Sequence, residues 1–329
     1  MREFLVHETT FARIAPRLKS YDADFDIVLV NDAGDFFEAS THEPVEAPRP
    51  QVAYGNVDVW FGPSARHFIR ACLGSDRLEW FQSSAAGVDN AALKALGRSA
   101  DFYTTNHLNA EAIGEWALWQ ALDWLKRGPG HRTAQANKQW KRLRQREICG
   151  SRWAIVGYGS IGEAIGKRAS ALGAVVRGVR RSSGPANGAE QIIHPDELAS
   201  VAAWADIVVF CMPQTPETEG MGDAAFFANM RADSLFINVG RGNAVDEVAL
   251  ITALDAGAPE AAVLDVTCVE PLPEDSPLWL HPAVTITPHD SADTFGTIVR
   301  ADDTFFENLK RFLEEKPLHN LIEAAAFET

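Results

Sequence analysis

The stretch WAIVGYGSIGEAIGKRASALGAVVRGVRRSS, residues 153–183, decides the fold class of this chain. An apolar run leads into Gly157, Gly159 and Gly162, an amphipathic helical pattern follows, and a second apolar run closes the stretch. In the spacing G-x-G-x-x-G, the first glycine makes a tight turn and the second lets the backbone approach a pyrophosphate. The third lets helix and strand pack closely, and the N–H groups at the start of the helix favour an anion. Because this strand–helix–strand pattern surrounds the glycines, we predict a dinucleotide site rather than a mere glycine-rich turn.

The second apolar run is followed by Arg180, Arg181 and Ser182, where an acid is expected. A carboxylate about 20 residues after the glycines binds the ribose 2′-hydroxyl of NAD, whereas an arginine there accommodates the 2′-phosphate of NADP. A guanidinium can hold a phosphate with paired hydrogen bonds, and a carboxylate would repel it. The alternative is a solvated basic turn. In a chain with a formal charge of −15, this basic cluster favours NADP(H), with NAD(H) as the second cofactor to consider.

Composition and charge argue against several classes of protein. The chain has 329 residues, of which 46% are hydrophobic, so we expect two domains with sizeable cores. Its 45 acidic residues against 30 basic ones repel phosphate backbones, so we expect no nucleic-acid partner. The four cysteines form no C-x-x-C pair, which indicates neither a metal site nor a disulfide framework. Without a signal-peptide pattern or an apolar run long enough to span a bilayer, we expect a cytoplasmic protein that does not bind membranes.

Short apolar runs alternate with helical patterns in two series, which predicts two parallel sheets covered by helices. In the first series we expect strands at Glu3–His7, Phe25–Val30, Val57–Gly62 and Leu78–Gln82. In the second series we expect strands at Ala154–Val156, Val175–Val179, Ile207–Cys211, Leu235–Asn238, Ala262–Leu264 and Val284–Thr287. Between the series, Asn106–Lys126 is an apolar, tryptophan-rich helical stretch that should be buried and should end at Arg127–Gly130.

Three later strands are each followed by a polar residue suited to hydride chemistry on a 2-keto acid, namely Arg241, Glu270 and His289. In a doubly wound sheet the carboxyl ends of the strands line the ligand crevice, so these side chains should converge. Arginine can hold a carboxylate and polarise a carbonyl, and an imidazole can protonate the developing alkoxide. A carboxylate beside that imidazole orients the ring and stabilises the imidazolium. Each residue alone has an ordinary structural alternative, but three at successive strand ends favour an active site.

The same motifs carry a family resemblance. Five segments resemble, in order and spacing, the D-isomer-specific 2-hydroxyacid dehydrogenases: VGYGSIG (156–162), MPQTPETEGM (212–221), FINVGRG (236–242), LDVTCVEPLPEDSPLW (264–279) and TITPHDSA (285–292). Two more, FQSSAAGVDN (81–90) and TTNHLNAEAIGEWAL (104–118), resemble that family's N-terminal loop and interdomain helix. Because a whole series matches rather than one motif, the resemblance is specific.

The resemblance implies an α/β fold of two Rossmann-like or flavodoxin-like domains with doubly wound parallel sheets. A discontinuous substrate domain would comprise residues 1–105 and 291–329, and the dinucleotide-binding domain residues 106–290. Homodimers are usual in this family, and the chain shows no metal-binding pattern.

The resemblance also implies roles for individual residues. Arg241 would bind the substrate carboxylate and carbonyl, and His289 would be the acid/base paired with Glu270. Backbone amides at the loop of Ala85, Ala86 and Gly87 would clasp the substrate carboxylate, and Asp265 would contact the nicotinamide carboxamide. The full cofactor-binding set is Gly157, Gly159, Ser160, Ile161, Gly162, Arg180, Arg181, Ser182, Met212, Pro213, Thr218, Val239, Gly240, Arg241, Asp265, His289 and Ala292.

Three positions depart from the family pattern. Asp290 stands where the family usually has an apolar residue, Ala85 replaces a glycine common in the substrate loop, and Arg180 replaces the usual NAD-selecting acid. Trp140 lies where some glyoxylate/hydroxypyruvate reductases of this family carry an aromatic residue near the partner's active site; ordinary packing is the alternative.

From these features we expect reduction of a small 2-keto acid, such as glyoxylate or hydroxypyruvate, to a D-2-hydroxy acid. Hydride would come from the nicotinamide C4, preferably of NADPH, and the proton from His289. The alternative from another class is a cofactor-sensing, corepressor-like binding protein on the same scaffold. A third hypothesis is a family relative with another substrate, such as phosphoglycerate, formate or phosphite. The loop QSSAAGVDN offers no basic residue for the phosphate of phosphoglycerate.

Overall fold

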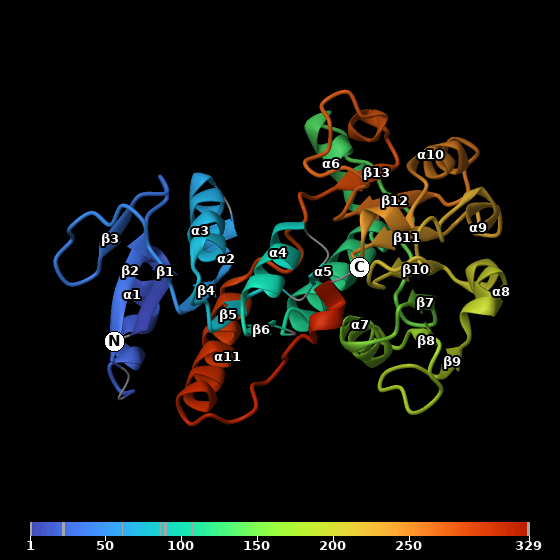
Figure 1. Ribbon diagram of the computed structural model, residues 1–329. Helices are drawn as coiled ribbons and strands as arrows, with labels where there is room; N and C mark the ends of the chain where they lie inside the picture. The colour runs from blue at the N-terminus through green and yellow to red at the C-terminus, as the bar shows by residue number, and fades with distance from the viewer. Residues whose placement is uncertain are drawn as a thin grey trace. The chain divides into compact units, whose positions relative to one another are not determined.

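The computed structural model describes residues 2–21, 24–60, 62–85, 87–88, 91–106 and 108–327. The chain divides into two compact units, each built around its own sheet (Figure 1). The first unit is Met1–Asn109 together with Asp293–Thr329, and the second is Ala110–Ala292. The last segment of the chain therefore completes the unit that the first segment begins.

The first unit contains a six-stranded sheet of order β3-β2-β1-β4-β5-β6. The strands are β1 (Arg2–His7), β2 (Phe25–Val30), β3 (Phe36–Glu38), β4 (Val52–Gly55), β5 (Trp80–Ser83) and β6 (Phe102–Thr104). All neighbours are parallel except β2 and β3. The parallel part has the order of flavodoxin-like folds, in which ligands bind beyond the carboxyl ends of the strands.

Helices cover both faces of this sheet. They are α1 (Glu8–Leu18), α2 (Val57–Trp60), α3 (Pro63–Gly74), α4 (Ala91–Ser99) and α11 (Phe295–Leu313), with a final 3-10 turn at Ala324–Phe327. Side chains of α1 and α11 pack on one face, and those of α2, α3 and α4 pack on the other. The alternation of Phe4 and Val6 with Leu5 along β1 supplies one residue set to each core.

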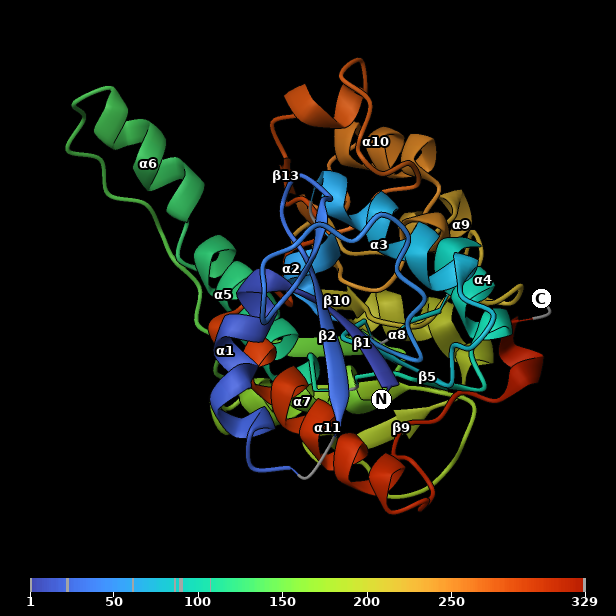
Figure 2. The ribbon, with the colours of Figure 1, turned by 60° about the vertical axis from the view of Figure 1, so that its left-hand side comes forward.

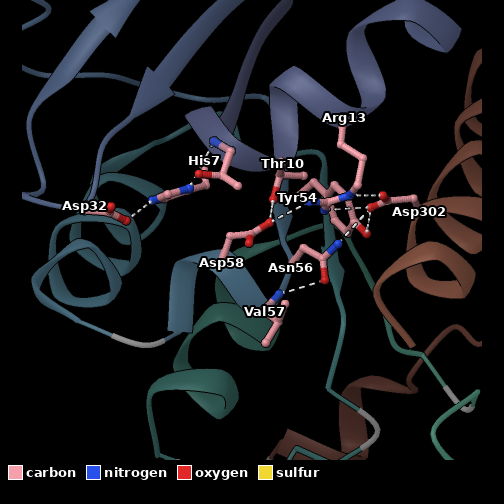
Figure 3. A network of polar contacts seen from close by, with 10 residues as sticks. His7, Thr10, Arg13, Asp32, Tyr54, Asn56, Val57, Asp58 and Asp302 are labelled. Atoms are coloured by element: carbon pink, nitrogen blue, oxygen red, sulfur yellow. Dashed lines mark hydrogen bonds and ion pairs between the residues drawn. The ribbon is translucent and has the colours of Figure 1, made fainter. Parts of the chain in front are cut away.

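Asp302 ties α11 into the first unit (Figure 3). Its buried carboxylate accepts hydrogen bonds from Tyr54 Oη and Asn56 Nδ2, both at 2.8 Å, and from the guanidinium of Arg13. Arg13 Nη1 also lies 3.1 Å from Asp58 Oδ2. Because each buried charge has a partner, the network stabilises the position of the last helix rather than leaving a reactive group exposed.

The second unit contains a seven-stranded, wholly parallel sheet of order β13-β12-β11-β10-β7-β8-β9. The strands are β7 (Arg152–Val156), β8 (Val175–Val179), β9 (Gln191–Ile193), β10 (Ile207–Phe210), β11 (Leu235–Asn238), β12 (Ala261–Leu264) and β13 (Val284–Ile286). This is the Rossmann order, whose direction reverses between β7 and β10, and such a reversal marks a ligand crevice.

Helices also cover both faces of the second sheet. They are α5 (Ala110–Leu125), α6 (Gly128–Ala136), α7 (Ser160–Ala171), α8 (Leu198–Trp204), α9 (Ala224–Ala228) and α10 (Glu247–Asp255). Three 3-10 turns lie at Pro195–Glu197, Gly242–Ala244 and Pro277–Leu280. Helices α5 and α7 pack on one face and α8, α9 and α10 on the other, whereas α6 extends away from the sheet (Figure 2).

The predicted fold class is confirmed, because both sheets are dominated by parallel strands with helices on both faces. One expected strand is wrong. Residues 57–60 form the helix α2, and the strand that precedes it is β4 (Val52–Gly55). Asn56 ends that strand, since its side-chain oxygen and its carbonyl accept the N–H groups of Val57 (2.7 Å) and Val59 (2.9 Å).

The apolar helix predicted at Asn106–Lys126 is shorter in the structure. It is α5, which begins at Ala110 and ends at Leu125, and Arg127 follows it with a left-handed φ of 57°. The predicted end of the helix is therefore present, and the helix α6 begins directly after Arg127, at Gly128. No helix among the described residues is long and apolar enough to cross a membrane.

Candidate active site

The glycine loop between β7 and α7 has the geometry of a phosphate-binding turn. Gly157 has a φ of 91°, and a Cβ there would lie 2.6 Å from the backbone nitrogen of Met212, so the position requires glycine. A Cβ at Gly162 would lie 3.0 Å from the carbonyl oxygen of Gly157, which reflects close packing of helix and strand. A Cβ at Gly159 would meet no described atom within 4 Å, so a ligand can approach the backbone there.

The start of α7 presents backbone donors beside that opening. The N–H of Glu163 bonds to the carbonyl of Gly159 at 2.8 Å, which closes the first turn of the helix. The preceding N–H groups, those of Ser160 and Ile161, belong to the turn whose donors have no intrahelical acceptor. Together with the helix dipole they suit an anion, so the residues present fit the pyrophosphate of a dinucleotide.

The segment after β10 lies directly against the glycine loop. Met212 is buried, and a Cβ at Gly240 would lie 2.8 Å from its carbonyl oxygen, so three backbone segments meet here. Thr218 Oγ1 donates to the carbonyl of Pro213 at 2.8 Å and fixes the turn between them. Five residues of the predicted cofactor-binding set thus lie on neighbouring parts of one sheet edge: Gly157, Met212, Pro213, Thr218 and Gly240.

Arg180 braces the loop that follows β8. Its guanidinium donates to the backbone carbonyls of Tyr158 (3.2 Å), Ser182 (3.0 Å), Gly184 (3.2 Å) and Pro185 (2.9 Å). The side chain therefore connects this loop to the glycine loop, and most of its N–H donors are already used.

Arg181 and Ser182 are the exposed neighbours of Arg180. Arg181 lies near Glu217: a hydrogen bond from Thr215, together with the charge of Arg181, holds the pKa of Glu217 below its usual range. The sequence could show the basic cluster but not which arginine is held by the backbone.

His289 and Glu270 form a hydrogen-bonded pair. His289 Nδ1 lies 2.8 Å from Glu270 Oε2, and the N–H of Thr267 donates to Glu270 Oε1 at 3.1 Å. Both side chains remain accessible, with 50% of His289 and 39% of Glu270 exposed. Because Nδ1 faces the carboxylate, the other ring nitrogen, Nε2, is the one available to a substrate.

The pair changes the pKa of both partners. The hydrogen bond to Glu270 raises the pKa of His289 above its ordinary value and outweighs the opposing effect of partial burial. Partial burial by itself would raise the pKa of Glu270, but the hydrogen bond and charge of His289 bring it below the ordinary value. The geometry therefore favours an imidazolium paired with a carboxylate.

Asp265 organises the backbone around His289. Its carboxylate, on a residue only 2% exposed, accepts bonds from Thr287 Oγ1 (2.6 Å) and from the N–H groups of Asp290 (3.0 Å) and Ser291 (3.2 Å). Its carbonyl accepts the N–H of His289 at 2.8 Å. In the structure this carboxylate fixes the backbone on both sides of His289. The contact with the nicotinamide that the resemblance implies stays a prediction.

Arg241 lies within electrostatic reach of the pair. Its positive charge contributes to lowering the pKa of both Glu270 and His289. Its Nη1 donates to the carbonyl of Gly240 at 2.8 Å, and its own carbonyl accepts from Asn238 Nδ2 at 3.0 Å. Asn238 thus fixes the backbone of the turn that carries Arg241.

The predicted substrate loop lies in the first unit. Ala86 is outside the described residues, whereas Ala85 and Gly87 are described. The N–H of Ala85 donates to Ser83 Oγ at 3.1 Å, and its carbonyl accepts the N–H of Asn106 at 3.3 Å. Ala85 is not among the described residues with positive φ, so the Cβ that replaces the family's glycine brings no left-handed strain.

The remaining predicted residues have ordinary surroundings. Val239 is buried and its N–H bonds to the carbonyl of Phe210 at 2.9 Å, while Ala292 packs against the core shared by α5 and α7. Trp140 is 101% exposed, which makes it unlike a core tryptophan. Among the described residues, no group of three or more His, Cys, Asp or Glu side chains could hold a metal ion.

Several residues that shape the site were not predicted from the sequence. Thr267 supports Glu270 through its backbone N–H, and a backbone contact leaves no signal in residue type. Thr287 binds Asp265 through its side-chain hydroxyl, which was the available signal in the sequence, whereas Ser291 binds it through its backbone N–H. In the first unit, the hydrogen bond from Trp60 Nε1 to Ser84 Oγ, next to the predicted substrate loop, was likewise not predicted.

Comparison with known proteins agrees with this geometry. Residues 118–291, more than half of the chain, match the model of the D-isomer specific 2-hydroxyacid dehydrogenase, NAD binding domain. A curated relative, "Glyoxylate/hydroxypyruvate reductase A" of Photorhabdus laumondii, is 31% identical over 197 residues, which are 60% of this chain and 62% of that protein. The chain thus aligns with less than two thirds of that relative's length.

Two solved structures are similar over almost the whole chain. A D-isomer specific 2-hydroxyacid dehydrogenase family protein from Aeromonas salmonicida has a TM-score of 0.80 and 28% identity, with 98% of this chain and 99% of that chain covered. A D-isomer specific 2-hydroxyacid dehydrogenase from Xanthobacter autotrophicus, solved in complex with NADPH and MES, has a TM-score of 0.74 and 26% identity, with 99% of both chains covered. With its glycine loop and its His289–Glu270 pair in that family's NAD binding domain, the chain belongs to the D-isomer specific 2-hydroxyacid dehydrogenases.

Proposed function

We propose that this protein reduces a small 2-keto acid to the D-2-hydroxy acid, with NADPH as the preferred cofactor. The observation that carries the proposal is the 2.8 Å contact between His289 Nδ1 and Glu270 Oε2. It lies in the same unit as a glycine loop that fits a dinucleotide and within the field of Arg241. An acid/base pair, a cationic anchor and a dinucleotide loop are the parts that reversible hydride transfer to a carbonyl needs.

Each side chain has a defined task in this reaction. The bound cofactor supplies the hydride that adds to the keto carbon. Arg241 binds the substrate carboxylate and polarises the keto oxygen with its fork of donors. His289 donates the proton on Nε2 to that oxygen, while Glu270 holds Nδ1–H and stabilises the imidazolium. In the first unit, the loop of Ala85, Ala86 and Gly87 clasps the carboxylate through backbone amides.

The preference for NADPH rests on the loop after β8. With most donors of Arg180 engaged by backbone carbonyls, Arg181 and Ser182 are the exposed groups that we assign to the 2′-phosphate. The Xanthobacter autotrophicus relative was solved with NADPH, which supports this choice. NAD(H) remains the second cofactor to test.

Glyoxylate and hydroxypyruvate are the proposed substrates, because the curated relatives are named for them. The corepressor-like alternative is not favoured, since the relatives that match are named as reductases and dehydrogenases.

We also propose that the protein is a cytoplasmic homodimer in which an arm formed by residues 128–145 contacts the partner. Trp140 is fully exposed on this arm, among the exposed basic residues Lys138, Lys141, Arg142 and Arg144. Glu260 binds Arg127 and Arg146, which stand at the two ends of the arm. An overall charge of −15 gives a second copy an acidic surface for it. Sedimentation equilibrium should give twice the chain mass of 36.0 kDa, and Trp140→Ala should shift the mass towards one chain.

Within this proposal, residues 1–105 and 291–329 form the substrate domain, and residues 106–290 bind the dinucleotide. The boundaries of the two compact units, at 109/110 and 292/293, lie within a few residues of these limits and support the assignment.

The experiment follows the oxidation of NADPH and NADH at varied concentrations of glyoxylate, hydroxypyruvate, pyruvate and bulkier 2-keto acids. We expect faster turnover with NADPH and the highest kcat/KM among the small acids. Arg181→Ala should lower the ratio of kcat/KM for NADPH to that for NADH by roughly tenfold or more, because a charge-assisted phosphate contact is lost. Arg180→Ala should also reduce thermal stability, because its carbonyl contacts are lost. Absence of turnover with every acid, or an unchanged cofactor ratio, would contradict the respective part of the proposal.

A further inference from the structure

Trp60 is linked to the substrate loop by a side-chain hydrogen bond. Its indole Nε1 donates to Ser84 Oγ at 3.2 Å, across 24 residues of sequence. Trp60 is the last residue of α2, and Ser84 directly follows β5 and directly precedes Ala85. The bond therefore joins the loop proposed to clasp the substrate to an element that follows a different strand.

The indole ring of Trp60 is held in one position by its neighbours. A Cβ at Gly55, the last residue of β4, would lie 2.6 Å from Trp60 Cζ2 and 2.9 Å from Cη2, so the ring lies directly over this glycine. The ring of Phe68 meets it edge-on, with centroids 6.3 Å apart, and the ring of Phe81 lies 6.5 Å away. Glycine at position 55 and two aromatic neighbours thus fix the direction in which the indole N–H points.

The backbone of the loop is held from the same side. The N–H of Ser84 donates to the carbonyl of Gly55 at 2.9 Å, so Gly55 supports both the indole and the loop. The next residue, Ala85, is held by Ser83 Oγ at 3.1 Å and by the N–H of Asn106 at 3.3 Å. Main-chain contacts therefore fix one side of residues 84 and 85, and the indole holds the side chain of Ser84.

We propose that Trp60 is a positioning residue for substrate binding, which acts by holding Ser84 and thereby the backbone of Ala85 at the start of the predicted substrate loop. The inference rests on the proposed function, because it takes this loop as the part that clasps the substrate carboxylate. Backbone amides bind a carboxylate strongly only when they already point at it, so a fixed loop loses less entropy on binding. Trp60 need not touch the substrate for this effect.

A second tryptophan in the same unit separates positioning from ordinary stabilisation. Trp80 Nε1 donates to Thr104 Oγ1 at 2.9 Å, and its side chain is fully buried. It stands at the first residue of β5, whereas the substrate loop follows the last. Trp80→Phe therefore removes the same type of bond from the same unit without touching the loop.

The experiment compares Trp60→Phe, Ser84→Ala, Ser84→Thr and the double variant Trp60→Phe/Ser84→Ala, with Trp80→Phe as the control. Oxalate, a planar analogue of a 2-keto acid, is the probe, and its Kd is measured calorimetrically on protein saturated with NADP⁺. Loss of one hydrogen bond should weaken oxalate binding roughly 2- to 10-fold in each single removal variant. The double variant should be no worse than either, and Ser84→Thr should keep the wild-type Kd.

Kinetics add a readout that a merely structural role would not change. The same removal variants should raise KM for the 2-keto acid by the same factor and leave kcat and the KM for NADPH unchanged, because the clasp binds ground state and transition state alike. Trp80→Phe should lower Tm without changing the Kd of oxalate. The calorimetric Kd of oxalate does not depend on turnover. A wild-type protein that shows no activity would therefore refute the proposed function, whereas the role of Trp60 would still be tested by the Kd values.

The outcomes that would overturn the inference are separate. Oxalate binding that is unchanged in Trp60→Phe and Ser84→Ala would remove the positioning role. Additive losses in the double variant would show that the two side chains act independently rather than through their bond. No oxalate binding by the wild-type protein would show that the loop does not clasp a carboxylate.

Discussion

Replacing Asp265 with alanine tests how the site holds His289. The carboxylate is the acceptor for Thr287 Oγ1 at 2.6 Å and for the N–H groups of Asp290 and Ser291 at 3.0 and 3.2 Å. These three residues flank His289, whose own φ of 56° is an uncommon conformation for a residue with a side chain. Without the carboxylate, nothing that we identify replaces these three bonds in keeping the backbone in that conformation.

The magnitude follows from the donors that lose their acceptor. A buried donor left unsatisfied costs about 1–3 kcal/mol. Ser291 is only 5% exposed, so its N–H should carry the full cost, whereas the exposed Asp290 can be solvated. We therefore expect a total of about 2–4 kcal/mol. If this energy is added to the activation barrier because His289 is displaced, kcat falls roughly 30- to 1000-fold. If it is instead lost from the free energy of unfolding, Tm falls by about 2–4 °C per kcal/mol.

The assay is steady-state NADPH oxidation at saturating keto acid together with a thermal melt of the same samples. Asp206→Ala is the matched control, because Asp206 accepts bonds from the backbone and guanidinium of Arg152 at the amino ends of the strands. The control should lose stability and keep kcat. Wild-type kcat and Tm in Asp265→Ala would refute the reasoning. A large rise in the KM for NADPH at unchanged kcat would instead make Asp265 a cofactor contact.

Three further variants and a melt of the wild type across pH test other parts of the site. Glu270→Gln should lower the pKa of His289, because the hydrogen bond to the carboxylate raises it. Since reduction requires the protonated imidazole, kcat/KM should decline at a lower pH in the variant than in the wild type. Identical pH profiles of kcat/KM would contradict the pairing. In the wild type, the His289–Glu270 pair should stabilise the fold fully between pH 4.5 and 6.5, the ordinary pKa values of the two groups. This stabilisation should be lost as pH rises through the raised pKa of His289, and also as pH falls through the lowered pKa of Glu270. Thermal melts across pH measure both losses. Gly159→Ala should keep Tm but weaken NADPH binding, measured by fluorescence titration, whereas Gly157→Ala should lower Tm, because its Cβ would lie 2.6 Å from Met212. Equal effects of the two glycine variants on Tm and affinity would exclude different roles for the two glycines.

The fold class was predictable because it depends on patterns that tolerate local error. The glycine spacing and the alternation of apolar runs with helical patterns predicted both sheets, although the strand expected at residues 57–62 is the helix α2 in the structure. That run is apolar enough for a strand, but Asn56 accepts the N–H groups that follow it and turns the chain. The short strands β3, β6 and β9 have three residues each, too few for a period to be visible.

The candidate site was predictable where residue type and chemistry coincide. Arg241, Glu270 and His289 follow strands of one parallel sheet, and the structure brings Glu270 and His289 into contact. Contacts to the backbone were not predictable. The carbonyls that bind Arg180 come from residues of four different types, and only the folded loop brings them together. The same holds for the indole of Trp60 and the hydroxyl of Ser84, which lie 24 positions apart.

The central claim is that His289 donates the proton to the substrate oxygen. Its most direct test is the turnover of His289→Ala with saturating NADPH and saturating glyoxylate or hydroxypyruvate, with cofactor binding checked separately. Loss of the proton donor should reduce kcat by roughly 10²- to 10⁴-fold in the variant saturated with NADPH. Wild-type turnover by this variant at full occupancy would contradict the account.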